Sequence, residues 1–114
     1  MALLSNYKVI GSFAINPNKS FETTMILDTG AGPSCMKTAM LPAHWEKEAT
    51  MHATKALQAA NGKPLACRAT VPLFLRFGDY IAKDRFLVVD DLPVAVLLGA
   101  GFQDTHLSLI KKWC

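Results

Sequence analysis

One apolar run of the sequence ends in a carboxylate, and this arrangement constrains the fold more than any other feature. Met25-Ile26-Leu27 is typical of a buried strand, and Asp28 follows it directly, at the start of a turn that contains Gly30, Gly32 and Pro33. Burying a carboxylate is costly unless partners hold it. Asp28 therefore either caps the turn through backbone N–H groups or is kept for chemistry, and the residue types alone leave both readings open.

The first half of the chain alternates between strand-like runs and turn residues. Val9–Ile15 and Phe21–Leu27 are expected to form a hairpin closed by Asn16-Pro17-Asn18-Lys19. Met51–Ala60 is expected to be extended but irregular. Asn61-Gly62 is the strongest short hairpin signal, because both residues tolerate the positive φ of a type I′ turn. Turn chemistry alone does not decide whether that hairpin covers a ligand or only connects two strands.

The second half continues in the same pattern, with turn residues between short apolar runs. The expected strands are Val71–Phe77, Arg85–Val89, Val94–Leu98 and Leu107–Ile110, with one helical turn at Gln103–Leu107. Asp90-Asp91 precedes Leu92-Pro93 and is interpreted as a solvated turn, not as a catalytic pair. Seven or so strands with little helix predict an all-β fold, a small closed β-barrel-like domain that spans residues 1–114.

The bulk properties set the size of the domain and exclude some partners. A length of 114 residues and a hydrophobic share of 51% fit one domain with one modest core. The net charge of +3 is mild and the basic residues are scattered, so no nucleic-acid partner is expected. No apolar run reaches the length that crosses a bilayer, so no membrane partner is expected either.

Cysteine and histidine usage indicates neither a disulfide framework nor a metal site. The three cysteines are odd in number and lack CxxC spacing, and the three histidines are far apart in sequence. The N-terminal apolar run is too short for a signal peptide. We therefore expect no metal and no cofactor, and a reducing, cytoplasmic location.

Three stretches have the order and spacing of motifs from one enzyme family. Asp28-Thr29-Gly30-Ala31, preceded by Ile26-Leu27 and followed by Ser34, resembles the active-site motif of the aspartic proteases. Val94–Gly99 is similar to the apolar strand that lies beneath the active-site loop in that family. Leu57–Leu65 resembles the flap hairpin of its short, retropepsin-like members, particularly those of long-terminal-repeat retrotransposons. The resemblance covers Val9 to Ile110, nearly the whole chain.

This resemblance implies an aspartic endopeptidase that cleaves extended peptides, and polyprotein processing as its role. Pepsin-like enzymes carry two Asp-Thr/Ser-Gly motifs in a much longer chain, whereas this chain carries one, so the resemblance implies a homodimer. The terminal segments Met1–Val9 and Leu107–Ile110 are expected near the dimer contact. The implied catalytic residues are Asp28, Thr29 and Gly30, and the implied substrate-binding residues are Ala31, Gly32, Ala59, Ala60, Asn61, Gly62 and Leu98.

The implied chemistry uses two carboxyl groups that share one proton, so that one acts as base while the other acts as acid. The sequence departs from the viral pattern where Gly32 replaces Asp and Ala100 replaces Arg, which leaves subsite preference and dimer stability open. Two other classes remain: an inactive protease-like module for dimerisation or peptide binding, and an unrelated β-barrel binding protein in which Asp28 caps a turn. Loss of hydrolysis in Asp28→Asn separates the first reading from both.

Overall fold

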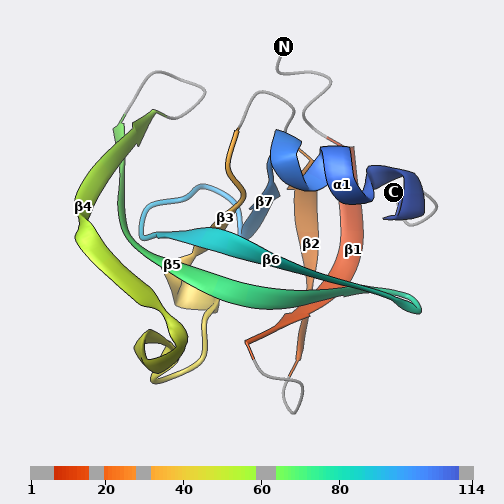
Figure 1. Ribbon diagram of the computed structural model, residues 1–114, viewed down its shortest axis with the longest axis horizontal. Helices are drawn as coiled ribbons and strands as arrows, with labels where there is room; N and C mark the ends of the chain where they lie inside the picture. The colour runs from red at the N-terminus through yellow and green to blue at the C-terminus, as the bar shows by residue number, and fades with distance from the viewer. Residues whose placement is uncertain (1–6, 16–19, 28–31, 59–63, 111–114) are drawn as a thin grey trace.

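The computed structural model describes residues 7–15, 20–27, 32–58 and 64–110, and they form a strand-rich structure with one α-helix (Figure 1). The strands are β1 (Tyr7–Ala14), β2 (Phe21–Leu27), β3 (Cys35–Lys37), β4 (Thr50–Gln58), β5 (Pro64–Phe77), β6 (Tyr80–Val89) and β7 (Val96–Leu98). Two short 3-10 helices, η2 (Thr38–Met40) and η3 (Trp45–Glu48), lie between β3 and β4, and α1 (Ala100–Ile110) follows β7.

Six of these strands close into a ring. The order around it is β1-β2-β7-β3-β6-β5, and β5 returns to β1 through three pairs from Ser12↔Arg76 to Ala14↔Phe74. Closure leaves fewer free strand edges, which is how small all-β domains avoid unpaired backbone groups. The predicted closed β-barrel is confirmed, with β4 added to β5 outside the ring at the left of Figure 1.

The hydrophobic core is formed by side chains at alternate positions of the strands, which point to the same face. Val71, Leu73, Leu75 and Phe77 recur at every second position of β5, and all four have no exposed surface. The other large side chains without exposed surface, or nearly so, come from the facing strands and from α1, and they are Phe13, Phe86, Phe102, Met25, Met36, Leu98, Ile110 and Val9. Trp45 joins this core from η3.

Pro72 lies in β5 at a position where the strand has a hydrogen-bonded neighbour on one side only. Proline cannot donate a ladder hydrogen bond, so within sheets it is confined to edges, strand starts and bulges. On one side β5 pairs with β6, where Pro72 lies opposite Arg85. On the other side β4 pairs only as far as Thr70 and β1 begins at Phe74, so Pro72 lies in the gap between these two partners. Pro72 therefore lies at a local edge inside a long strand.

The predicted C-terminal strand is wrong. Leu107–Ile110 is the last part of α1, an 11-residue helix that begins at Ala100. Helical spacing aligns Phe102, His106 and Ile110 on one face, where Phe102 and Ile110 are buried, while Leu109 is 51% exposed. The segment that was expected as a strand near the dimer contact is therefore helical. No helix of the described residues is long and apolar enough to cross a membrane.

The predicted hairpin around Asn61-Gly62 is confirmed by its two arms. β4 and β5 are antiparallel, and their pairs run from Thr50↔Thr70 to Gln58↔Pro64, with a register shift between Met51 and Lys55. Residues 59–63 lie outside the described residues. The pairing therefore supports a hairpin, whereas the position of its tip stays a prediction.

Candidate active site

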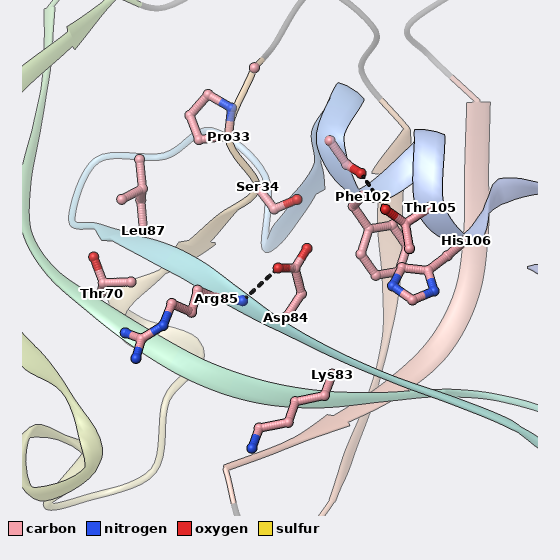
Figure 2. Close-up of a pocket in the computed structure, with 12 residues that line it drawn as sticks. Pro33, Ser34, Thr70, Lys83, Asp84, Arg85, Leu87, Phe102, Thr105 and His106 are labelled. Atoms are coloured by element: carbon pink, nitrogen blue, oxygen red, sulfur yellow. Dashed lines mark hydrogen bonds between the residues drawn. The ribbon is translucent and has the colours of Figure 1, made fainter.

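The segment 28–31 lies outside the described residues, but the structure shows how both of its ends are held. Before it, β2 ends at Leu27, which pairs in parallel with Leu98 at the end of β7. After it, the Ser34 side chain points toward α1 (Figure 2), and the backbone N–H of Gly99 donates a 3.0 Å hydrogen bond to Ser34 Oγ. The two ends of the segment that contains Asp28 therefore meet adjacent residues, Leu98 and Gly99, at the β7 to α1 junction.

Gly99 is required by the close approach of the chain that follows the segment. A Cβ at this position would lie 2.5 Å from the carbonyl oxygen of Pro33 and 2.6 Å from that of Gly32. Real Cβ atoms do not come this close to backbone atoms, so any side chain would displace the 32–33 backbone. The predicted packing of Gly99 under the loop agrees with this contact on the described side of the loop.

Two further residues stabilise this junction, and the sequence analysis assigned neither a role in the site. Gln103, buried in the first turn of α1, donates from Nε2 to the carbonyl oxygen of Leu98 at 2.9 Å. The carbonyl oxygen of Ser34 accepts a 2.9 Å hydrogen bond from the N–H of Leu87 on β6. A signal for Gln103 was present, because a polar residue in an otherwise apolar helix start often bonds to nearby backbone.

The structure describes only part of the predicted site. Gly32 is exposed, and its carbonyl oxygen accepts a 3.5 Å hydrogen bond from the N–H of Gly101. Leu98 has no exposed surface and lies in the main core, so we revise its assignment from substrate binding to support of the loop. The other predicted site residues, Asp28, Thr29, Gly30, Ala31, Ala59, Ala60, Asn61 and Gly62, lie outside the described residues.

A second apolar cluster lies on the face of β7 and β3 that points away from the main core. Because side chains alternate along a strand, Val96 and Leu98 enter the core while Leu97 projects to the other face. There Leu97 packs, partly buried, with Leu87 and Val94 against a small buried cluster. That buried cluster consists of Cys35, Cys67, Val89 and Leu92. An apolar, partly open surface therefore borders the chain that follows residues 28–31.

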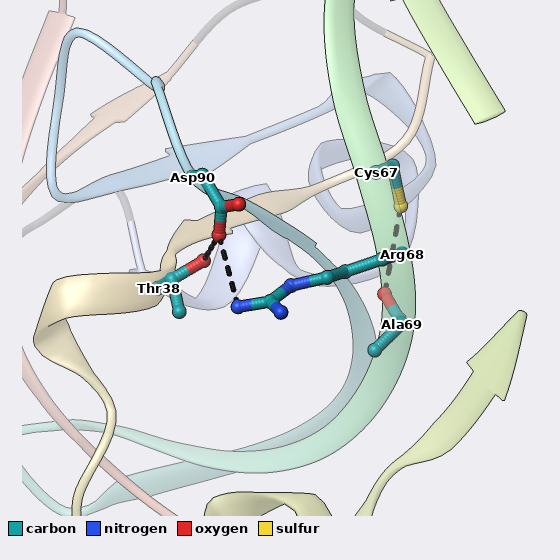
Figure 3. A network of polar contacts seen from close by, with 5 residues as sticks. All are labelled: Thr38, Cys67, Arg68, Ala69 and Asp90. Atoms are coloured by element: carbon teal, nitrogen blue, oxygen red, sulfur yellow. Dashed lines mark hydrogen bonds and ion pairs between the residues drawn. The ribbon is translucent and has the colours of Figure 1, made fainter. Parts of the chain in front are cut away.

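The acidic turn after β6 has a structural role. Asp90 Oδ1 accepts hydrogen bonds from Thr38 Oγ1 at 2.6 Å and from Arg68 Nη2 at 3.3 Å (Figure 3). These contacts connect η2 to β5 at a site where both charged side chains are about half exposed, so the ion pair contributes little free energy. The interpretation of Asp90-Asp91 as a turn is confirmed.

Among the described residues, no group of three or more His, Cys, Asp or Glu side chains is placed to hold a metal ion. Cys35 and Cys67 are both buried.

Comparisons with known proteins agree with this geometry. The sequence model of the family described as retroviral aspartyl protease matches residues 6–106. The retroviral protease-like domain of Ddi1 from Leishmania major has a similar fold, with a TM-score of 0.65, 13% identity, and coverage of 88% of this chain and 78% of that one. The EIAV protease, solved with the inhibitor HBY-793, aligns with a TM-score of 0.56, 19% identity, and coverage of 92% and 91%. No curated protein sequence matches the chain.

Proposed function

The chain belongs to the retroviral aspartyl protease family, and from this premise we propose that it is an aspartic endopeptidase in which Asp28 activates water. The observation that supports this proposal best is the anchoring of both ends of segment 28–31. Leu27 pairs with Leu98, and Ser34 bonds to Gly99, so the described chain on both sides of Asp28-Thr29-Gly30 is held at one place in the barrel. Catalytic groups need such rigid support, because small displacements lower rates strongly.

The proposed catalytic unit is a symmetric homodimer with one Asp28 from each copy. Two carboxyl groups held close together cannot both ionise, so the pair shares one proton. The ionised member takes a proton from water as the water attacks the peptide carbonyl, and the protonated member serves as acid. Thr29 would fix the two loops to each other, and Gly30 would let the substrate backbone approach closely because it has no Cβ.

The proposed substrate is an extended peptide segment, bound between the catalytic turns and the β4–β5 hairpin. The tip of that hairpin, Ala59 to Gly62, would close over the peptide and exclude water. The partly open apolar surface of Leu87, Val94 and Leu97 supports a preference for apolar side chains near the cleaved bond. A retrotransposon polyprotein, processed in the cytoplasm, is the substrate that fits the retropepsin-like character of the chain.

A peptide-library digestion tests this function. The wild-type protein and Asp28→Asn, matched for folding by circular dichroism, are incubated with the same library at acidic and neutral pH, and products are identified by mass spectrometry. We expect endoproteolytic products from the wild type only, because the amide can neither act as base nor share a proton. Equal cleavage by the two proteins would refute the proposal. Peptide binding without cleavage by either would indicate an inactive binding module.

A further inference from the structure

A cavity of about 440 Å³ lies beside the chain that follows segment 28–31 (Figure 2). One wall is the 32–34 backbone, the second is the middle of β6, and the third is the first half of α1. The lining residues are Gly32, Pro33, Ser34, Thr70, Lys83, Asp84, Arg85, Leu87, Gly101, Phe102, Thr105 and His106. The cavity therefore shares its first wall with the candidate active site, and no role assigned above uses it.

Asp84 stands out in this cavity because its strand position is one that faces the barrel interior. Along β6 the burial alternates, with Ala82 and Phe86 in the core and Lys83 and Arg85 exposed. Asp84 lies in the row of Ala82 and Phe86 and is half-buried. Figure 2 shows its carboxylate directed toward Ser34 and α1. Carboxylates at such positions are normally paired or hydrogen-bonded, because desolvation is costly.

The described residues do not supply Asp84 with a cation. Its Oδ1 atom accepts the backbone N–H of Arg85 at 2.8 Å, and no ion pair forms with it among these residues. The Lys83 ammonium lies 5.3 Å from the centre of the Phe74 ring, on the outer face. The Arg85 guanidinium points away from Asp84, toward Thr70 (Figure 2). Among the described residues, the Asp84 carboxylate therefore has no ion-pair partner, although Lys83 and Arg85 also belong to the lining.

The remaining walls suit the stem of a long basic side chain. The ring centroids of Phe102 and His106 lie 4.6 Å apart, with Phe102 buried and His106 partly exposed. The His106 ring is held in place by a 2.6 Å hydrogen bond between Nδ1 and Tyr80 Oη. Gly101 keeps the space open, since a Cβ there would have only one atom near it, the Gly32 oxygen at 3.9 Å. Aliphatic stems and cationic heads pack favourably on aromatic rings.

Leu87 connects this cavity with the apolar surface of the candidate active site. Leu87 is one of the residues that line the cavity, and its side chain packs in the cluster with Leu97 and Val94. In an extended peptide, alternate side chains point the same way and lie roughly 6.5 to 7 Å apart. A peptide with one side chain on the apolar surface would have to run past Leu87 for the side chain two residues farther out to enter the cavity.

We propose that this cavity is a subsite for a lysine or arginine side chain of the peptide substrate, with Asp84 as its charged partner. The inference rests on the proposed protease function and adds a requirement to it: a basic residue two positions beyond the apolar one, on the side away from the cleaved bond. Asp84 acts in recognition only and takes no part in the chemistry.

Cleavage kinetics test the proposal with four peptides that differ only at that outer position, carrying Lys, Arg, norleucine or Glu. We expect wild-type kcat/KM to be about tenfold higher for Lys and Arg than for norleucine, as for a charge-assisted hydrogen bond that is partly open to water. Asp84→Asn should remove this preference, so that the Lys, Arg and norleucine peptides are cleaved with similar kcat/KM. Asp84→Lys should show its highest kcat/KM for the Glu peptide. Asp79→Asn removes a negative charge from the exposed turn between β5 and β6, and this control should behave as the wild type.

A binding measurement keeps this test separate from the catalytic one. The four peptides, labelled with fluorescein, are titrated by anisotropy into Asp28→Asn and into the Asp28→Asn, Asp84→Asn double variant, with melting temperatures as folding controls. Tighter binding of Lys and Arg peptides to the first protein alone supports the subsite even if no peptide is cleaved. Cleavage without a basic preference, a Glu preference in the wild type, or equal affinities in the two variants would each overturn it.

Discussion

The backbone N–H of Gly99 donates a buried 3.0 Å hydrogen bond to Ser34 Oγ, across 65 residues of sequence. Gly99 follows β7, and Ser34 lies shortly after segment 28–31, which contains Asp28. The bond therefore holds the chain after this segment next to the strand that pairs, through Leu98, with Leu27 before it. A single hydroxyl group thus connects barrel stability with the position of the proposed nucleophile-activating residue.

Ser34→Ala should destabilise the protein by roughly 1 to 3 kcal/mol, because the buried N–H of Gly99 loses its acceptor. Catalytic rate should fall as well, since the segment before Ser34 loses one anchor. Urea unfolding and kcat measure the two effects. Ser108→Ala, at an exposed hydroxyl of α1, is the matched control and should change neither. A wild-type unfolding midpoint for Ser34→Ala would contradict the role of this bond.

Gly99→Ala should destabilise by at least about 3 kcal/mol, because the new Cβ would overlap the carbonyl oxygens of Pro33 and Gly32. Gly101→Ala is the natural comparison, two residues farther along and inside α1. Its Cβ meets only the Gly32 oxygen at 3.9 Å, and alanine favours the helix, so stability should rise by up to about 1 kcal/mol. Thermal unfolding of the two variants measures the difference. Similar melting temperatures would argue against close packing at Gly99.

Dilution should lower the specific activity, because the proposed catalytic pair takes one Asp28 from each of two copies. Activity per mass is measured over several decades of protein concentration, and sedimentation velocity reports the oligomeric state in parallel. The two transitions should coincide. Mixing the wild type with excess Asp28→Asn should also suppress activity, since mixed dimers lack one carboxyl group. A monomer with full activity at every concentration would exclude the homodimer.

The pH profile of kcat/KM should be bell-shaped, with its maximum on the acid side of neutrality. The pair is active with one proton, so activity should fall at low pH, where both carboxyl groups are protonated, and again at higher pH, where both are ionised. Rates are measured well above the dimer dissociation constant, so that dissociation does not distort either limb. An alkaline maximum would show that Asp28 is not half of a shared-proton pair.

Local residue patterns were sufficient to predict much of the architecture. The series of strand-like runs spaced by turn residues predicted the closed barrel, and the Asn61-Gly62 signal predicted the hairpin whose arms are β4 and β5. Only the resemblance to the aspartic proteases implied that the strand before Gly99 lies beneath the segment that follows β2. These features are readable because glycine and asparagine mark turns through backbone sterics, which depend little on distant contacts. The catalytic assignments to Asp28, Thr29 and Gly30 stay predictions, since those residues lie outside the described part of the chain.

Only tertiary packing decided which way individual side chains face. The four residues Leu107–Ile110 are too few to distinguish a strand from a helix by their apolar pattern. They are helical in the structure because Phe102, His106 and Ile110 then share the face that packs on the barrel. Leu97 and Leu98 are adjacent residues of the same type, yet Leu98 enters the core and Leu97 lines the outer apolar surface. The sequence by itself determined where strands and turns occur, because backbone preferences are local. Whether a strand presents a given face to the core, the cavity or water depends on its register with strands distant in sequence. The inward position of Asp84 is therefore decided by the closed barrel and not by the local sequence.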